Sequence, residues 1–205
     1  MSPTLDERLE RLRLGNQRFC SGQTTAHSSL TAARLETVSG TRRPWLVVLG
    51  CMDARVPVEQ VFDLELGEAV VLRSPGCLVG DACAAGMELA AQALQPELVV
   101  VLGHGDNLAV KGAMENATPD AQVLARAYHR MLPDIRSLGL QGQGAEAVRA
   151  AVHAVTAGAA RDLQKRSPTL AERVQQGTTA LRQAFYDVET GRVDWITPQQ
   201  DQSGP

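Results

Sequence analysis

The chain has 205 residues, a length typical of one domain, and its 44% hydrophobic and 21% charged residues are typical of a soluble globular protein. Its 20 basic and 23 acidic residues leave a formal net charge of −3, which argues against a nucleic-acid partner recognised through bulk charge. No apolar run approaches the roughly 18 residues that a bilayer span needs, so we expect no membrane partner either.

Residues 1–44 are predicted to form an N-terminal helical arm. Residues 4–19 place apolar side chains at helical spacing among charged ones, which predicts an amphipathic helix whose end is weakened by Gly15. This segment mixes acids with bases and lacks the apolar stretch of a secretory signal. We therefore expect the chain to reside in the cytoplasm, or in a cytoplasmic microcompartment.

Three short apolar runs are rich in valine or leucine and lack polar alternation. They cover residues 45–50, 69–72 and 98–102, and such runs are typical of strands buried on both faces of a parallel sheet. The alanine-rich segment 82–94, which Pro96 ends, predicts a helix between the second run and the third. A strand–helix–strand unit of this kind requires a right-handed crossover.

The C-terminal half is predicted to add helices and a β-hairpin. Helices are expected at 120–138, 145–165 and 168–176, the last with Ser167 as its cap. Two β-type runs within 184–196 surround turn residues, which indicates a hairpin, and residues 198–205 are expected to form a flexible tail. This order of elements predicts a single α/β domain over residues 1–205, with a central, mainly parallel β-sheet flanked by helices.

Two of the predicted strands end in a glycine that is followed at once by a reactive side chain. These side chains are Cys51 and His104. Ligands in open α/β sheets bind beyond the carboxyl ends of the strands, so the two side chains face each other if their strands are neighbours. A thiolate and an imidazole are ligands that zinc prefers.

Asp53 and Arg55 follow Cys51 at steps of two residues. A carboxylate paired with a guanidinium beside a metal can hold a bound water and gate access to the metal. The same residues also admit a purely structural interpretation. In that interpretation Cys51 is a packed strand end, His104 is a core histidine with satisfied hydrogen bonds, and Asp53 forms a local ion pair with Arg55.

These motifs resemble the β-class carbonic anhydrases, whose patterns are C-x-D-[SA]-R and H-x-x-C. Cys51, Asp53 and Arg55 match the first pattern within GCMDARVP, and His104 begins the second within VVVLGHGDNLAVKGA. The similarity runs over nearly the full chain and includes GNQRF near the start, VVLRSPG after the second strand and AFYDVETGRV near the end.

The resemblance implies zinc-dependent, reversible hydration of CO2 to bicarbonate by a homodimer or higher even oligomer. It implies that Cys51 and His104 are zinc ligands. It also implies that Asp53 accepts a hydrogen bond from the zinc-bound hydroxide, and that Arg55 holds Asp53 in place.

The chain departs from the family at Asn107, where the second zinc cysteine should stand. An amide is a poor substitute for a thiolate on zinc. Three outcomes are open: Asp53 or Asp106 replaces the missing ligand, or the chain is a catalytically silent homologue with a structural, assembly or anion-binding role, or Cys51 acts as a nucleophile beside His104. Asn107 also suits a helix cap.

Other candidates rest on residue type alone. Cys77 stands where the family commonly has asparagine, near the active site, and it is considered as a ligand together with Cys83; His27, His129 and His153 are considered as proton shuttles. An inhibitory bicarbonate site in some family members uses a tryptophan and an arginine. This chain has Val48 and Arg73 at those places, so we do not expect that site.

Overall fold

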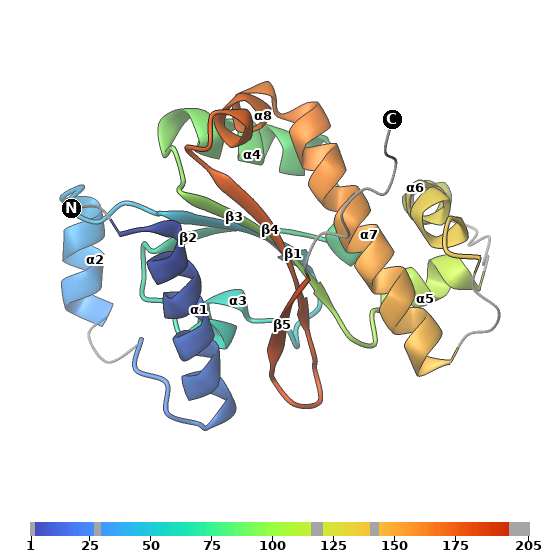
Figure 1. The fold of residues 1–205 in the computed structure, drawn as a ribbon, viewed down its shortest axis with the longest axis horizontal. Helices are drawn as coiled ribbons and strands as arrows, with labels where there is room; N and C mark the ends of the chain where they lie inside the picture. Colours follow the sequence, from blue (N-terminus) through green and yellow to red (C-terminus); the bar gives the residue numbers. More distant parts are fainter. Residues whose placement is uncertain (1–2, 27–29, 116–120, 140–143, 197–205) are drawn as a thin grey trace.

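Within the residues that the computed structural model describes, 3–26, 30–115, 121–139 and 144–196, five strands form one sheet in the order β2-β1-β3-β4-β5 (Figure 1). The strands are β1 (Leu46–Cys51), β2 (Ala69–Ser74), β3 (Leu98–His104), β4 (Ala180–Tyr186) and β5 (Val193–Ile196). All neighbours are parallel except β4 and β5, which are antiparallel. The predicted fold class is confirmed: this is a single α/β domain with a mainly parallel sheet.

The three predicted apolar runs correspond to β1, β2 and β3. Every residue of β1 and β3 is buried, as the continuous valine- and leucine-rich pattern predicts for strands with helices on both faces. For β2 the prediction of full burial is wrong, because β2 is the edge strand and its residues are only partly buried. β1 lies between β2 and β3, so the strand–helix–strand unit crosses over one strand.

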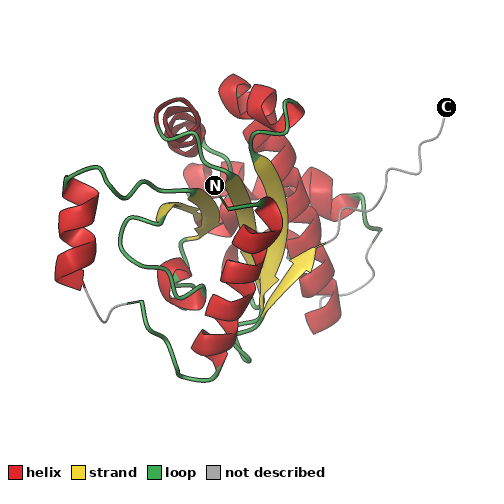
Figure 2. Ribbon diagram, turned by 60° about the vertical axis from the view of Figure 1, so that its left-hand side comes forward, coloured by secondary structure: helices red, strands yellow, loops and turns green. Residues whose placement is uncertain are grey.

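Helices cover both faces of the sheet, as Figures 1 and 2 show. They are α1 (Leu5–Cys20), α2 (Leu30–Val38), α3 (Val58–Val61), α4 (Asp81–Ala93), α5 (Leu108–Met114), α6 (Gln122–Arg136), α7 (Ala145–Arg166) and α8 (Pro168–Gln175). Side chains of α4, α7 and α8 pack on one face of the strands, and those of α1 and α3 pack on the other. Among the described residues, no helix is long and apolar enough to cross a membrane.

The predicted helix near the N-terminus is confirmed, but Gly15 does not weaken its end. α1 begins with a capping box between Thr4 and Glu7 and continues past Gly15 to Cys20. A Cβ atom at Gly15 would lie 1.9 Å from the backbone oxygen of Phe62. Gly15 therefore allows α1 to pack directly against the backbone that follows α3.

The predicted C-terminal hairpin is confirmed by β4 and β5. β4 begins at Ala180, earlier than predicted, and it also pairs in parallel with β3. The turn is held by Asp187, whose Oδ1 atom accepts hydrogen bonds from the backbone N–H groups of Glu189 and Thr190. The tail predicted at 198–205 lies outside the described residues.

Candidate metal centre

Cys51 and His104 lie side by side at one rim of the sheet. Cys51 ends β1 and His104 ends β3, and the two strands are parallel neighbours. The two residues are only 4% and 0% exposed. The His104 ring lies close enough to the Cys51 sulfur to affect the pKa of the thiol. The structure thus brings together the two residues that the sequence analysis singles out as thiolate and imidazole ligands.

The surroundings of Cys51 lower the pKa of its thiol. Burial raises the pKa of its thiol, but the neighbouring His104 ring and the backbone N–H groups of Asp53 and Gly76 outweigh burial and lower the pKa below its usual value. Gly76 belongs to a short 3-10 turn, Pro75–Cys77, that follows β2. Groups at two neighbouring strand ends therefore make this thiol ionise more readily than a free cysteine.

Asp53 is held by Arg55 through both carboxylate oxygens. Arg55 Nε lies 3.0 Å from Oδ1 and Nη2 lies 2.8 Å from Oδ2, and the Arg55 backbone N–H donates to Oδ1 at 2.9 Å. The hydrogen bonds from the Arg55 side chain hold the pKa of Asp53 at about 2. Asp53 is therefore ionised at neutral pH and is directed toward Arg55.

Asp106 is also directed toward Arg55. Its Oδ2 atom accepts a hydrogen bond from Arg55 Nη1 at 2.8 Å, and its other oxygen pairs with Lys111. Lys111 and then Arg55 hold the pKa of Asp106 at about 2. Neither Asp53 nor Asp106 completes a ligand set: among the described residues, no three His, Cys, Asp or Glu side chains are grouped so that they could hold a metal ion.

Asn107 is the N-cap of α5, which confirms the helix-cap interpretation of this residue. Its Oδ1 atom accepts hydrogen bonds from the backbone N–H groups of Ala109 and Val110, at 3.1 and 3.2 Å. Its Nδ2 atom lies 2.9 Å from Nε2 of His104. Asn107 is only 1% exposed, and both ends of its side chain form hydrogen bonds within the protein.

The hydrogen bonds of His104 determine which ring nitrogen carries the proton. Nδ1 lies 2.7 Å from the carbonyl oxygen of Gly105, which can only accept. Nδ1 therefore carries the hydrogen, and Nε2 has a free electron pair that accepts the N–H of Asn107. A neutral imidazole with this tautomer has the donor atom that zinc requires.

These contacts test whether the residues fit zinc. A catalytic zinc site has three protein ligands and an open position. The Cys51 thiolate and the His104 imidazole fit two of these places. Asn107 does not fit the third, because its oxygen accepts two backbone hydrogen bonds and its nitrogen is a donor with no available electron pair.

Arg73 supports the loop after β1, a role that the sequence analysis missed. Its Nε atom donates to the Cys51 carbonyl oxygen at 3.0 Å and its Nη2 atom donates to the Asp53 carbonyl oxygen at 2.6 Å. Arg73 pairs with Gly50 in the β1–β2 register, so it stands directly beside this loop. Only the strand register could have revealed the contact.

The remaining candidates do not join the Cys51–His104 pair in any described contact. Cys77 is buried and its thiol donates to the Leu102 carbonyl oxygen at 3.2 Å, while burial raises its pKa well above the usual value. His153 packs against Phe185, with ring centroids 5.0 Å apart. His129 is exposed on α6, Cys83 is partly buried on α4, Val48 is buried in β1, and His27 lies outside the described residues.

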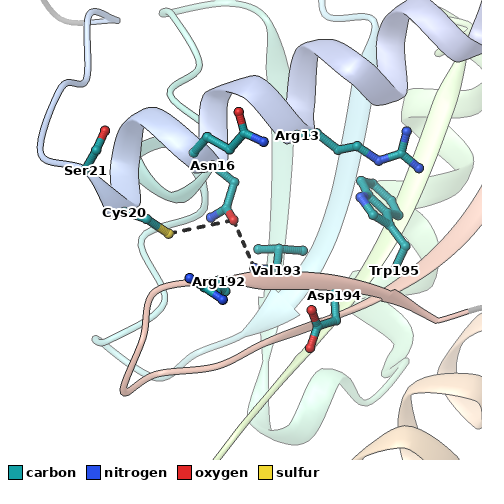
Figure 3. A pocket seen from close by; sticks show the side chains of 9 residues that line it. Arg13, Asn16, Cys20, Ser21, Arg192, Val193, Asp194 and Trp195 are labelled. Carbon is teal, nitrogen blue, oxygen red and sulfur yellow. Dashed lines mark hydrogen bonds between the residues drawn. The ribbon is translucent and has the colours of Figure 1, made fainter.

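A cavity of about 680 Å³ lies elsewhere, between α1 and β5 (Figure 3). Asn16 joins its two walls, since its Oδ1 atom accepts the backbone N–H of Val193 at 2.9 Å. The residues that line the cavity are Arg13, Asn16, Gln17, Cys20, Ser21, Arg192, Val193, Asp194 and Trp195. Cys51 and His104 are not among these residues, so this cavity is separate from the candidate metal centre.

Comparisons with known proteins agree with the fold and with the family resemblance. Residues 46–193 match the family described as carbonic anhydrase. The carbonic anhydrase of Mycolicibacterium smegmatis is 32% identical over 189 residues, which are 89% of each chain.

Solved structures of similar fold include the Coccomyxa β-carbonic anhydrase in complex with acetazolamide, with a TM-score of 0.70, 21% identity and coverage of 95% of this chain and 87% of that one. They also include the tetrameric β-carbonic anhydrases of Sordaria macrospora, with a TM-score of 0.69, 21% identity and coverage of 93% and 98%. Together with the family match and the relative at 32% identity, these likenesses show that the chain belongs to the β class of the carbonic anhydrase family.

Proposed function

We propose that the chain catalyses the reversible hydration of CO2 to bicarbonate at the rim formed by β1 and β3, with zinc held by Cys51 and His104. The observation that carries this proposal is the placement of Cys51 and His104 at the ends of two neighbouring parallel strands, beside a carboxylate held by Arg55. Family membership supports the same reaction, since the relatives are named carbonic anhydrases, which are lyases.

When bound, zinc would supply a water whose pKa is lowered to about 7 as the nucleophile for CO2. The protein's own contribution lies with Asp53. A carboxylate has about four lone-pair positions, and Arg55 occupies two on Oδ1 and one on Oδ2. The remaining position on Oδ2 can accept a hydrogen bond from the attacking water and orient it. Arg55 thereby acts as a positioning residue for Asp53.

A replacement ligand is the second part of the proposal. Asp53 is the candidate nearest to Cys51 in sequence, but it would have to give up its hydrogen bonds to Arg55 before it could serve. Arg55 would keep a partner in that event, because it also binds Asp106. Direct ligation by Asp53 and its role in orienting water exclude each other, so we expect slower turnover while Asp53 is a ligand.

Stopped-flow CO2 hydration with a parallel measurement of zinc content tests this function. We expect the purified chain with added zinc to hydrate CO2 and to hold about one zinc per chain. Both properties should be lost in Cys51→Ser and kept in Cys83→Ser, which alters a partly buried cysteine on α4. A chain that is fully loaded with zinc but hydrates CO2 no faster than buffer contradicts the proposal.

A catalytically silent homologue is the second candidate, and the Asn107 contact with His104 Nε2 favours it. In that case the hydrogen bond from Asn107 already occupies the free nitrogen of His104, and the rim needs no metal. The chain would then keep a structural, assembly or anion-binding role. Absence of CO2 hydration together with a folded, metal-free protein after zinc addition supports this candidate.

We further propose that the chain forms a homodimer or a higher even oligomer in the cytoplasm. Within the described part of the chain, β2 has no strand partner on its outer side, and the apolar side chains of Met52 and Leu89 are 62% and 67% exposed. Exposed apolar side chains next to an open strand edge are typical of a surface that another chain covers. Sedimentation equilibrium tests the proposal, and a monomer at micromolar concentration contradicts it.

A further inference from the structure

The electron pair that zinc needs on His104 is already occupied by a hydrogen-bond donor of the same chain. We infer that Asn107 acts as an internal cap on His104, so that zinc binds this centre only by displacing the Asn107 carboxamide. The inference rests on the proposed function in one respect, because it takes His104 as the zinc ligand. It goes further in assigning Asn107 an active part in weakening metal binding.

The direction of the carboxamide is determined by the fold. The backbone N–H groups of Ala109 and Val110 can only donate, so they require the oxygen of Asn107 on their side. A flipped amide would place its NH2 group against these two donors and its oxygen against the electron pair of His104 Nε2. All three hydrogen bonds would be lost in a place where Asn107 is almost fully buried.

The direction of the His104 ring is determined in the same way. Nδ1–H donates to the Gly105 carbonyl oxygen at 2.7 Å, and the ring is fully buried. A rotated ring would set the unprotonated Nε2 against that carbonyl oxygen, so the ring has no second nitrogen to offer to a metal. Zinc and the Asn107 N–H therefore compete for one electron pair, and the capping bonds of α5 hold the competitor in position.

Two variants of Asn107 distinguish the effect of its hydrogen bond to His104 from the effect of the missing third zinc ligand. Asn107→Ser removes the N–H that faces His104, keeps an oxygen that can cap α5, and adds no good zinc ligand. Asn107→Cys removes the same N–H and adds a thiolate. Asn16→Ser is the matched control, since Asn16 is another buried asparagine whose amide makes hydrogen bonds at both ends, none of them to Cys51 or His104.

Zinc affinity is measured by competition with a chromophoric chelator and by the zinc-dependent rise in Tm, neither of which requires activity. We expect Asn107→Ser to bind zinc about tenfold more tightly than wild type, because one hydrogen bond no longer competes. Asn107→Cys should gain on the order of a hundredfold or more. Asn16→Ser should bind zinc as wild type does.

The inference is overturned if wild type binds zinc as tightly as Asn107→Cys, or if folded Asn107→Ser shows no gain. Nitrogen-15 NMR of the metal-free wild type needs no variant: Nδ1 of His104 should be protonated and Nε2 unprotonated, and the reverse tautomer also overturns the inference. These results can be distinguished from a failure of the proposed function. The proposed function fails when a zinc-loaded chain does not hydrate CO2, whether or not Asn107 competes with zinc for His104.

Discussion

Arg55 binds Asp53 through two parallel hydrogen bonds, from Nε to Oδ1 at 3.0 Å and from Nη2 to Oδ2 at 2.8 Å. Two-pronged pairs of this geometry give orientation as well as attraction. The residues stand two positions apart on one loop, so the pair forms locally. Its direction relative to Cys51 and His104 depends on the neighbouring strands.

Removal of Arg55 should change the acid sensitivity of the protein. The pKa of Asp53 is about 2 in the folded chain, below the roughly 3.9 of an unfolded chain. A lowered pKa contributes stability above about pH 4 that is lost as the pH falls toward 2. In Arg55→Ala, Asp53 should contribute less to the loss of unfolding free energy on acidification. Urea-unfolding midpoints measured from pH 5 to pH 2 should therefore fall less steeply than in wild type.

The control for this prediction is Arg13→Ala. Arg13 is exposed and its only ion pair among the described residues is with Glu10, at 3.6 Å on the same helix. Its removal should leave the wild-type slope unchanged. Equal slopes for Arg55→Ala and wild type would show that Arg55 does not lower the pKa of Asp53.

Arg73 should matter for both stability and activity, although it does not touch the thiol or the imidazole. Arg73→Ala removes hydrogen bonds to the carbonyl oxygens of Cys51 and Asp53. We expect a loss of about 1–2 kcal/mol in the free energy of unfolding, measured by urea denaturation. We also expect CO2 hydration to fall about tenfold or more, because the loop that carries Asp53 is less well positioned. Full activity in a destabilised variant would restrict Arg73 to a structural role.

Gly15→Ala should destabilise the fold even though alanine is the better helix former. The added Cβ atom would lie 1.9 Å from the backbone oxygen of Phe62, and backbone cannot move aside as a flexible side chain does. We expect a loss of about 1–3 kcal/mol or more in the free energy of unfolding. Gly144→Ala, where nothing lies within 4 Å of the new Cβ atom, should cost less than about 1 kcal/mol. Similar losses for the two variants would contradict the close contact of α1 with Phe62.

Cys77→Ser should show whether Cys77, the second buried cysteine near the rim, takes part in zinc binding. The hydroxyl of serine can replace the thiol as donor to the Leu102 carbonyl oxygen, so the fold should be kept. We expect the zinc content and CO2 hydration of Cys77→Ser to stay within about twofold of wild type, in contrast to Cys51→Ser, because Cys77 makes no described contact with His104. Loss of zinc from folded Cys77→Ser would make Cys77 the replacement ligand.

Local patterns were enough to predict much of the fold. The apolar runs of β1 and β3 are buried on both faces because their sequences contain no polar alternation, and periodicity predicted α1 and α4 within about one residue. The motifs also predicted that Cys51 and His104 meet, on the condition that their strands are neighbours. The short helices α2, α3 and α5 were not predicted individually, because a few residues give too little periodicity.

The partners of the polar side chains were beyond the reach of the linear order. The sequence placed Asn107 at a ligand position and allowed it to be a helix cap, but it could not show which way the carboxamide points. That direction arises where a carbonyl group beyond β3, the first backbone N–H groups of α5 and the His104 ring come together. Hydrogen bonds are directional and join groups from different elements. Only the packed chain therefore decides that Asn107 donates a hydrogen bond to His104 and does not stand beside it as a second metal ligand.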